Sequence, residues 1–130
     1  KVQHHRLQDT VFFKADIDVY EQMGESDILV LPLRTCVGTS LQPNLIVEAM
    51  ATGLPIAVPC FEALETLVSF SENAIELSLE NVSLSAKKIE SAWINRQLTA
   101  MSHNQYKRFL EQHTLEHFLK GYSEALGVSK

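Results

Sequence analysis

The segment 43–58, PNLIVEAMATGLPIAV, joins a helix pattern directly to the pattern of a buried strand. Four of its apolar residues recur at helical spacing: Leu45, Ile46, Ala49 and Met50. Gly53 followed by Pro55 is a typical helix end, so this helix is expected to stop at Gly53. The run 56–58 is wholly apolar, which is typical of a strand buried on both faces of a parallel sheet.

Strand and helix patterns also alternate upstream of this segment. Residues 11–14 form a short β-rich run, and residues 17–25 carry apolar side chains at helical spacing before Gly24. The run 27–32, Asp-Ile-Leu-Val-Leu-Pro, lacks alternation and is expected to be a strand buried on both faces. Its Pro32 fits the end of a strand, where no ladder donor is needed.

Downstream, the pattern changes from mixed to helical. We expect a short helix over 61–70, a strand nearer an edge over 74–79, and helices over 83–101, 103–113 and 114–126 with Gly127 as the last cap. Because strands that alternate with helices need right-handed crossovers, the predicted fold is α/β. It is a Rossmann-like parallel sheet of about four strands with C-terminal helices, in one domain over residues 1–130.

Composition narrows the class of protein. The chain has 130 residues, 45% of them hydrophobic, and a net charge of -5 from 11 Lys and Arg against 16 Asp and Glu. An acidic chain without a basic run is a poor duplex nucleic-acid binder. Two cysteines cannot form a disulfide framework, and the polar start 1–9 carries no signal peptide, so a reducing cytoplasm is expected. The abrupt start is that expected of a fragment.

A ligand site is expected where strands end. Ligands of open α/β sheets bind at the carboxyl ends of the strands, and the loop 33–44 is the longest such connection in the body of the domain. It leads into the helix near Asn44, whose free amides and positive dipole favour a phosphate or a hydroxyl-rich ligand. Glu48 lies one turn inside that helix among apolar residues. Two interpretations stay open: a capping or loop-anchoring carboxylate, or one that binds a pair of ligand hydroxyls.

These residues resemble the donor-binding half of retaining, GT-B-fold glycosyltransferases of family 4. The family pattern is a strand ending in Leu-Pro, a Ser- and Gly-rich loop, and then Glu-(seven residues)-Glu-Ala-Met-Ala-x-Gly-x-Pro. Leu31-Pro32 and the segment 48–55 match it in register, and the resemblance covers residues 7–80. It implies that residues 1–130 are a partial donor-binding domain of an enzyme that transfers a hexose with retention.

The resemblance also implies roles for individual residues. Glu48 would accept hydrogen bonds from the ribose hydroxyls of a UDP- or GDP-sugar donor. Backbone amides before and at the helix start would contact the donor's sugar and phosphate: Leu41, Gln42, Asn44 and Leu45. Ser40 occupies the position of the family's first Glu and is the candidate catalytic residue. No metal or further cofactor is implied.

The partners implied by the resemblance lie outside this chain. They are the nucleotide-sugar donor, an acceptor glycan or lipid as in polysaccharide biosynthesis, and the family's N-terminal domain, with no nucleic acid. The expected location is the cytoplasm, with contact to the inner face of the membrane made through parts of the protein outside this chain.

Some residues depart from the family pattern. Ser40 can hydrogen-bond a hydroxyl but supplies no negative charge near an oxocarbenium ion. The family's Gly-Gly turn is replaced by residues 59–62, Pro-Cys-Phe-Glu, and the nearby cations Lys14 and Arg34 do not fit the family's diphosphate motif. The alternative function is therefore a catalytically inactive, glycosyltransferase-like binding or scaffold domain, and the fragment alone is expected to be inactive. A dinucleotide-binding domain is disfavoured because the Gly-rich fingerprint is missing.

Smaller signals favour structural roles. Cys36 and Cys60 both follow strand ends and are expected to be ordinary thiols near each other. His113 and His117 are expected on a solvated helix face, and the sequon 81–83 as a helix N-cap. The apolar residues of the last helices are expected to be core contacts or, where the family's last helix crosses to its other domain, exposed: Trp93, Ile94, Leu98, Phe109, Leu110, Leu115, Phe118, Leu119 and Tyr122.

Overall fold

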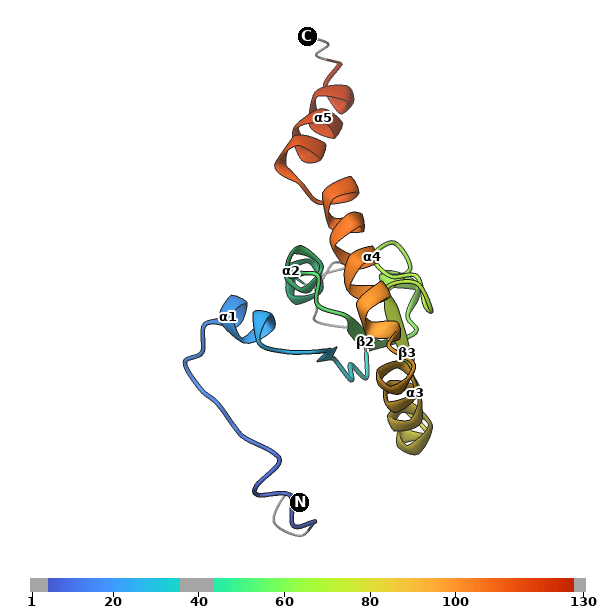
Figure 1. Ribbon diagram of the computed structural model, residues 1–130. Coiled ribbons are helices and arrows are strands. Elements are labelled where there is room, and N and C mark those ends of the chain that lie inside the picture. Colours follow the sequence, from blue (N-terminus) through green and yellow to red (C-terminus); the bar gives the residue numbers. More distant parts are fainter. Residues whose placement is uncertain (1–4, 36–43, 128–130) are drawn as a thin grey trace.

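A computed structural model of the protein describes residues 5–35 and 44–127. Its described part is a mixed α/β fold with a three-stranded parallel sheet in the order β1-β2-β3 (Figure 1). The strands are β1 (Leu29–Val30), β2 (Ile56–Pro59) and β3 (Ala74–Leu77). The helices are α1 (Val19–Gly24), α2 (Asn44–Thr52), α3 (Val82–Ile94), α4 (Gln97–Gln112) and α5 (Leu115–Ala125), with a 3-10 turn η1 (Glu62–Leu64). The α/β class and the parallel sheet are thus as predicted.

The sheet has one strand fewer than expected, because residues 11–14 form none. Phe12 and Phe13 are 72% and 87% exposed, and no described strand lies alongside them. A β-rich composition favours an extended chain, but a strand also needs a neighbouring strand to pair with. The expectation for residues 27–32 is also corrected, since β1 has two residues and Val30 is 44% exposed.

β2 is the centre of the domain, as its unbroken apolar run predicts. All four of its residues are buried. Ile56 and Val58 face a core formed with α1, α2 and the segment after η1, whereas Ala57 faces a second core formed with α3 and the start of α4. β3 lies at the edge, where Glu76 is exposed as the alternating pattern predicts. Two helical layers therefore sandwich the sheet.

Two of the predicted helices differ in the structure. The expected helix 83–101 breaks at Asn95 and Arg96, where Arg96 adopts the left-handed conformation with φ 55° and α4 begins. The expected helix 61–70 is only the turn η1. The caps are confirmed: the Asn81 side chain accepts from the Leu84 amide, and Gly127 follows α5 with φ +65°.

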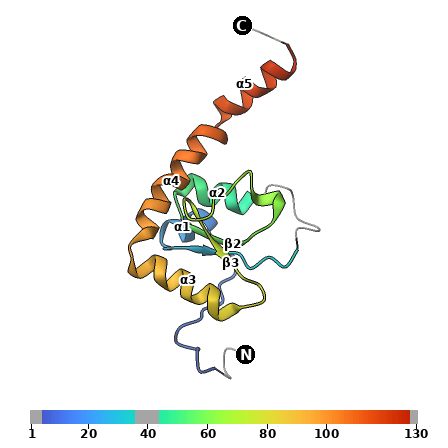
Figure 2. The same ribbon diagram turned by 90° about the vertical axis from the view of Figure 1, so that its right-hand side faces the viewer.

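α4 crosses from one face of the sheet to the other, and α5 extends away from the domain (Figures 1 and 2). Met101 joins the core beside α3, and Phe109 packs against the core beside α2. α5 has no buried residue. Core contacts are therefore confirmed only for Leu98 and Phe109, and the others expected there are exposed: Trp93, Ile94, Leu110, Leu115, Phe118, Leu119 and Tyr122.

Candidate functional site

The predicted site lies at the carboxyl ends of β1 and β2, on the side where α2 begins. Leu29 and Leu31 donate to the carbonyls of Pro55 and Ala57 at 2.8 and 2.9 Å, which aligns the two strands. Because the strands are parallel, their carboxyl ends share one edge of the sheet. The chain that leaves this edge after β1 returns as α2, which starts at Asn44.

α2 is held against the sheet by one apolar face. Ile46, Ala49 and Met50 are completely buried, whereas the N-terminal Asn44 is exposed. The helix ends at Gly53, as predicted, because Gly53 adopts φ +70° and lets the Leu54 amide bond back to the Ala49 carbonyl at 2.8 Å. The first amides of an α-helix have no partner within the helix, so those of α2 are directed towards this edge.

Glu48 occupies the border of the buried face of α2. It is half-buried, and its carboxylate has no hydrogen-bond or ion-pair partner among the described residues. A partly desolvated carboxylate is stabilised when a hydrogen-bond donor reaches it. A ligand hydroxyl pair would supply such donors. The described part of the chain supplies no anchoring partner for the capping interpretation.

The other predicted donor-binding residues divide into two groups. Asn44 and Leu45 are the first two residues of α2, and the Leu45 side chain packs against the core. Ser40, Leu41 and Gln42 lie outside the described residues, as does Cys36. The structure thus places Glu48, Asn44 and Leu45 within one helical turn and a half of each other.

The loop after β2 forms the other side of this edge. Cys60 is exposed, Phe61 packs against the core, and Glu62 begins η1. Glu65, which follows η1, is exposed. The backbone therefore leaves β2 in an extended conformation at Phe61, whose ring packs against the core, where the family pattern has two glycines.

Side chains of α4 hold residues 66–73, which follow this loop, by hydrogen bonds. The sequence patterns did not single out these side chains. Gln105 is completely buried and donates to the Asn73 carbonyl at 2.8 Å, while the Asn73 amide donates to Gln105 Oε1 at 3.2 Å. Arg108 donates to the Thr66 carbonyl at 2.9 Å. The available signal was Gln105 itself, a polar residue between Met101 and Phe109 at spacing i, i+4 on the face that packs on the core.

The cations near the site have different surroundings. Lys14 donates to the Gln22 side chain, and Arg34 follows β1 in an exposed position. Neither forms an ion pair with another described residue. Within the described ranges, no cluster of three His, Cys, Asp or Glu side chains is placed to hold a metal ion.

The two histidines lie on different helices, which corrects the expectation of one solvated face. His113 ends α4 and is half-buried, with Nε2 lacking a partner among the described residues, whereas His117 is exposed on α5. Burial, together with the nearby Arg108 guanidinium and His117, lowers the pKa of His113 below its usual value of 6.5. His113 therefore lies at the junction between α4 and α5.

Within the described residues, no helix has both the length and the apolar composition needed to cross a lipid bilayer.

Comparison with known proteins identifies the family. A family model described as "Glycosyl transferases group 1" matches residues 1–95, which include the sheet, α2 and Glu48. No curated protein matches the chain. The match covers more than half of the sequence and coincides with the parallel α/β part of the fold. The chain therefore belongs to the group 1 glycosyl transferases.

Proposed function

We propose that this domain binds a nucleotide-sugar donor and that the whole protein transfers a hexose from it with retention. The observation that carries the proposal is the half-buried carboxylate of Glu48, which has no described partner and lies beside the free amides of α2. Glu48 would accept hydrogen bonds from the two ribose hydroxyls of a UDP- or GDP-sugar. The amides of Asn44 and Leu45, with those of Leu41 and Gln42, would hold the sugar and the diphosphate.

The chemistry proposed is mainly electrostatic. In glycosyl transfer from a nucleotide sugar, the bond between the anomeric carbon and the diphosphate breaks, and negative charge grows on the leaving diphosphate. The acceptor oxygen forms the new bond to the anomeric carbon, and its proton passes to the leaving diphosphate. Amides fixed at a helix N-terminus stabilise that charge without reorganising. Ser40 would hydrogen-bond a hydroxyl of the donor sugar and thereby orient the anomeric carbon. The acceptor, a glycan or a lipid, and additional cations would come from a second domain.

A second function is favoured by two residue changes. Ser40 stands where the family pattern has a carboxylate, and Phe61 anchors the turn where that pattern has glycines. Both changes suit a domain that binds a donor-like ligand without transferring the sugar. Whether it is a transferase or a binding domain, the protein would act in the cytoplasm. Other parts of the protein would contact the inner face of the membrane.

Titration of the full-length protein with UDP- and GDP-hexoses in a calorimeter tests the proposal. We expect saturable binding of one nucleotide class, and Glu48→Gln should weaken it about tenfold or more, because it removes a charge-assisted hydrogen bond. Glu90→Gln, on the exposed surface of α3, is the matched control and should bind normally. Undiminished binding by Glu48→Gln would contradict the assignment. Release of nucleoside diphosphate on incubation with an acceptor would exclude the scaffold function.

A further inference from the structure

A side chain of α4 holds the backbone just after the loop that follows β2. Arg108 Nη2 donates to the Thr66 carbonyl at 2.9 Å, and Arg108 Nη1 donates to Ser69 Oγ at 3.1 Å. Its third nitrogen, Nε, is buried and has no partner among the described residues, so the two terminal nitrogens make the hydrogen bonds of this guanidinium. Arg108 therefore joins α4 to two points within residues 66–69.

Apolar burial alone leaves part of this segment without support. Leu64 and Leu67 are buried, but Glu65 and Thr66 between them are exposed. The Leu67 amide turns back to the Leu64 carbonyl at 2.9 Å, and no backbone amide of the described residues donates to the Thr66 carbonyl. A carbonyl left over at the end of such a turn needs a donor from elsewhere. Arg108 supplies one that is charged, and charge-assisted hydrogen bonds are the stronger kind.

The loop that Arg108 supports lies at the edge of the sheet where the donor site is proposed. Residues 60–65 continue directly from β2, and the parallel register of β2 with β1 brings the carboxyl ends of both strands to that edge. The Thr66 carbonyl, which Arg108 holds, comes one residue after this loop. The sheet therefore fixes the loop at one end, and Arg108 fixes it at the other.

Building on the proposed donor-binding function, on which this step rests, we propose that Arg108 is a positioning residue of the donor site. It keeps residues 60–65 in the arrangement that a bound nucleotide sugar meets, and it acts through this loop without touching the donor. A loop that is already fixed loses less conformational freedom on binding, which increases affinity. Arg108 lies on α4, outside residues 1–95 that match the family model, so the match itself does not include this role.

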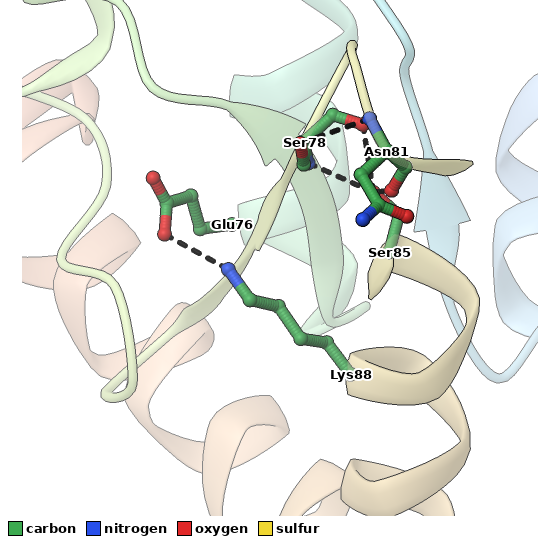
Figure 3. Close-up of polar contacts among 5 residues, drawn as sticks. All are labelled: Glu76, Ser78, Asn81, Ser85 and Lys88. Atoms are coloured by element: carbon green, nitrogen blue, oxygen red, sulfur yellow. Dashed lines mark hydrogen bonds and ion pairs between the residues drawn. The ribbon is translucent and has the colours of Figure 1, made fainter. Parts of the chain in front are cut away.

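The connection from β3 to α3 serves as an internal reference for testing this role (Figure 3). Ser85 Oγ accepts from the Ser78 amide at 2.8 Å and donates to the Ser78 carbonyl at 3.0 Å. Lys88 pairs with Glu76 at 2.9 Å. None of these contacts involves α4, so a change at Arg108 should leave them intact.

Hydrogen exchange of the full-length protein, followed by mass spectrometry, tests whether Arg108 fixes the loop. Arg108→Gln should speed amide exchange in residues 61–68 about tenfold, because losing hydrogen bonds to a charged group eases local opening. Exchange in residues 76–88 should not change. Lys107→Gln is the matched control, since it removes the same charge from the next residue, whose ion pair with Glu111 spans 3.9 Å. Equal loop exchange in Arg108→Gln and the parent protein would overturn the proposal.

Calorimetry with the nucleotide sugar tests whether the loop position matters for the donor. Arg108→Gln should weaken donor binding about tenfold, and Lys107→Gln should not. Arg108→Lys keeps the charge but not the paired terminal nitrogens, so it should restore part of the affinity. In the parent protein, bound donor should slow exchange in residues 60–65. Faster loop exchange without weaker donor binding would overturn the positioning role.

Ser69→Ala keeps the test decisive if Arg108→Gln does not fold. It removes one of the two acceptors of Arg108, so loop exchange should rise about threefold with a smaller loss of donor affinity. Unchanged exchange and affinity in Ser69→Ala would also overturn the proposal. A parent protein that binds no nucleotide sugar would refute the proposed function together with the positioning role. Equal donor binding by the parent and Arg108→Gln would refute the positioning role alone.

Discussion

Gly53 offers a sharp test of how the helix that carries Glu48 is positioned. Gly53 is buried, has φ +70°, and lies beside Ser102 and Tyr106 of α4. A Cβ added there would lie 3.3 Å from Ser102 Oγ and 3.4 Å from the Ser102 carbonyl oxygen. Gly53→Ala therefore combines backbone strain with crowding against a neighbouring helix.

The expected change in the free energy of unfolding combines two destabilising terms and one stabilising term. The left-handed conformation costs alanine about 1–2 kcal/mol. Crowding in a packed interior adds about 1 kcal/mol at the low end of the usual range. The less flexible unfolded chain of the variant returns about 0.7 kcal/mol. The free energy of unfolding should fall by about 2 kcal/mol, which lowers the Tm of a domain of this size by about 8 °C.

Urea unfolding followed by circular dichroism measures this change. Gly121→Ala is the matched control, because Gly121 lies inside α5 with nothing within 4 Å of an added Cβ. That control should be neutral or stabilising by up to about 1 kcal/mol. Adding Ser102→Ala to Gly53→Ala should restore only part of the loss, since the strained φ and the carbonyl contact remain. A Gly53→Ala variant as stable as the parent protein would refute the reasoning.

Two further predictions concern α4. Gln105→Ala should lower the free energy of unfolding by about 2–3 kcal/mol in urea titration, because it removes the donor to the buried Asn73 carbonyl and leaves the Asn73 side-chain amide only its 3.4 Å bond to the Leu67 carbonyl; a loss below about 0.5 kcal/mol would contradict the role of this pair. Because the folded state lowers the pKa of His113, the unfolded chain binds that proton more tightly, so stability should fall as the pH drops through and below 6.5. In urea unfolding at pH 5.0–7.5, His113→Gln should show a smaller decline than the parent protein, and an identical pH profile would exclude His113 as the source.

The sequence predicts best the parts of the fold that depend on local patterns. The α2–β2 segment is correct in type and nearly so in its bounds, because helical spacing, Gly53 and a wholly apolar run are local signals. Residues 11–14 fail because strand formation depends on a partner that a local pattern does not contain. Helical spacing predicts α5 itself, but it says nothing about what covers the apolar side chains, and Phe118 and Tyr122 stack on each other in solvent-exposed positions.

For the candidate site as well, local sequence patterns predict one part, and contacts between distant residues determine the rest. The strand ends, the start of α2 and the position of Glu48 follow from the order of elements and from helical spacing. The contacts between α4 and residues 66–73 do not, because Gln105 and Asn73 are far apart in the sequence and no local pattern pairs them. Arg96 likewise ends a helix in a conformation that usually calls for glycine. The roles of Glu48, Asn44 and Leu45 stay predictions, as do those of Ser40, Leu41 and Gln42, which lie outside the described residues.

The central claim, that Glu48 binds the donor ribose, is tested most directly by pairing a change in the protein with a change in the ligand. Calorimetry would compare the preferred nucleotide sugar with its 2′,3′-dideoxyribose analogue, each against the parent protein and Glu48→Ala. If Glu48 binds the ribose, the analogue should bind the parent about tenfold to a hundredfold more weakly, and Glu48→Ala should bind both donors with the same low affinity. If Glu48→Ala still distinguishes the two donors as strongly as the parent does, Glu48 does not hold the ribose and the assignment is contradicted.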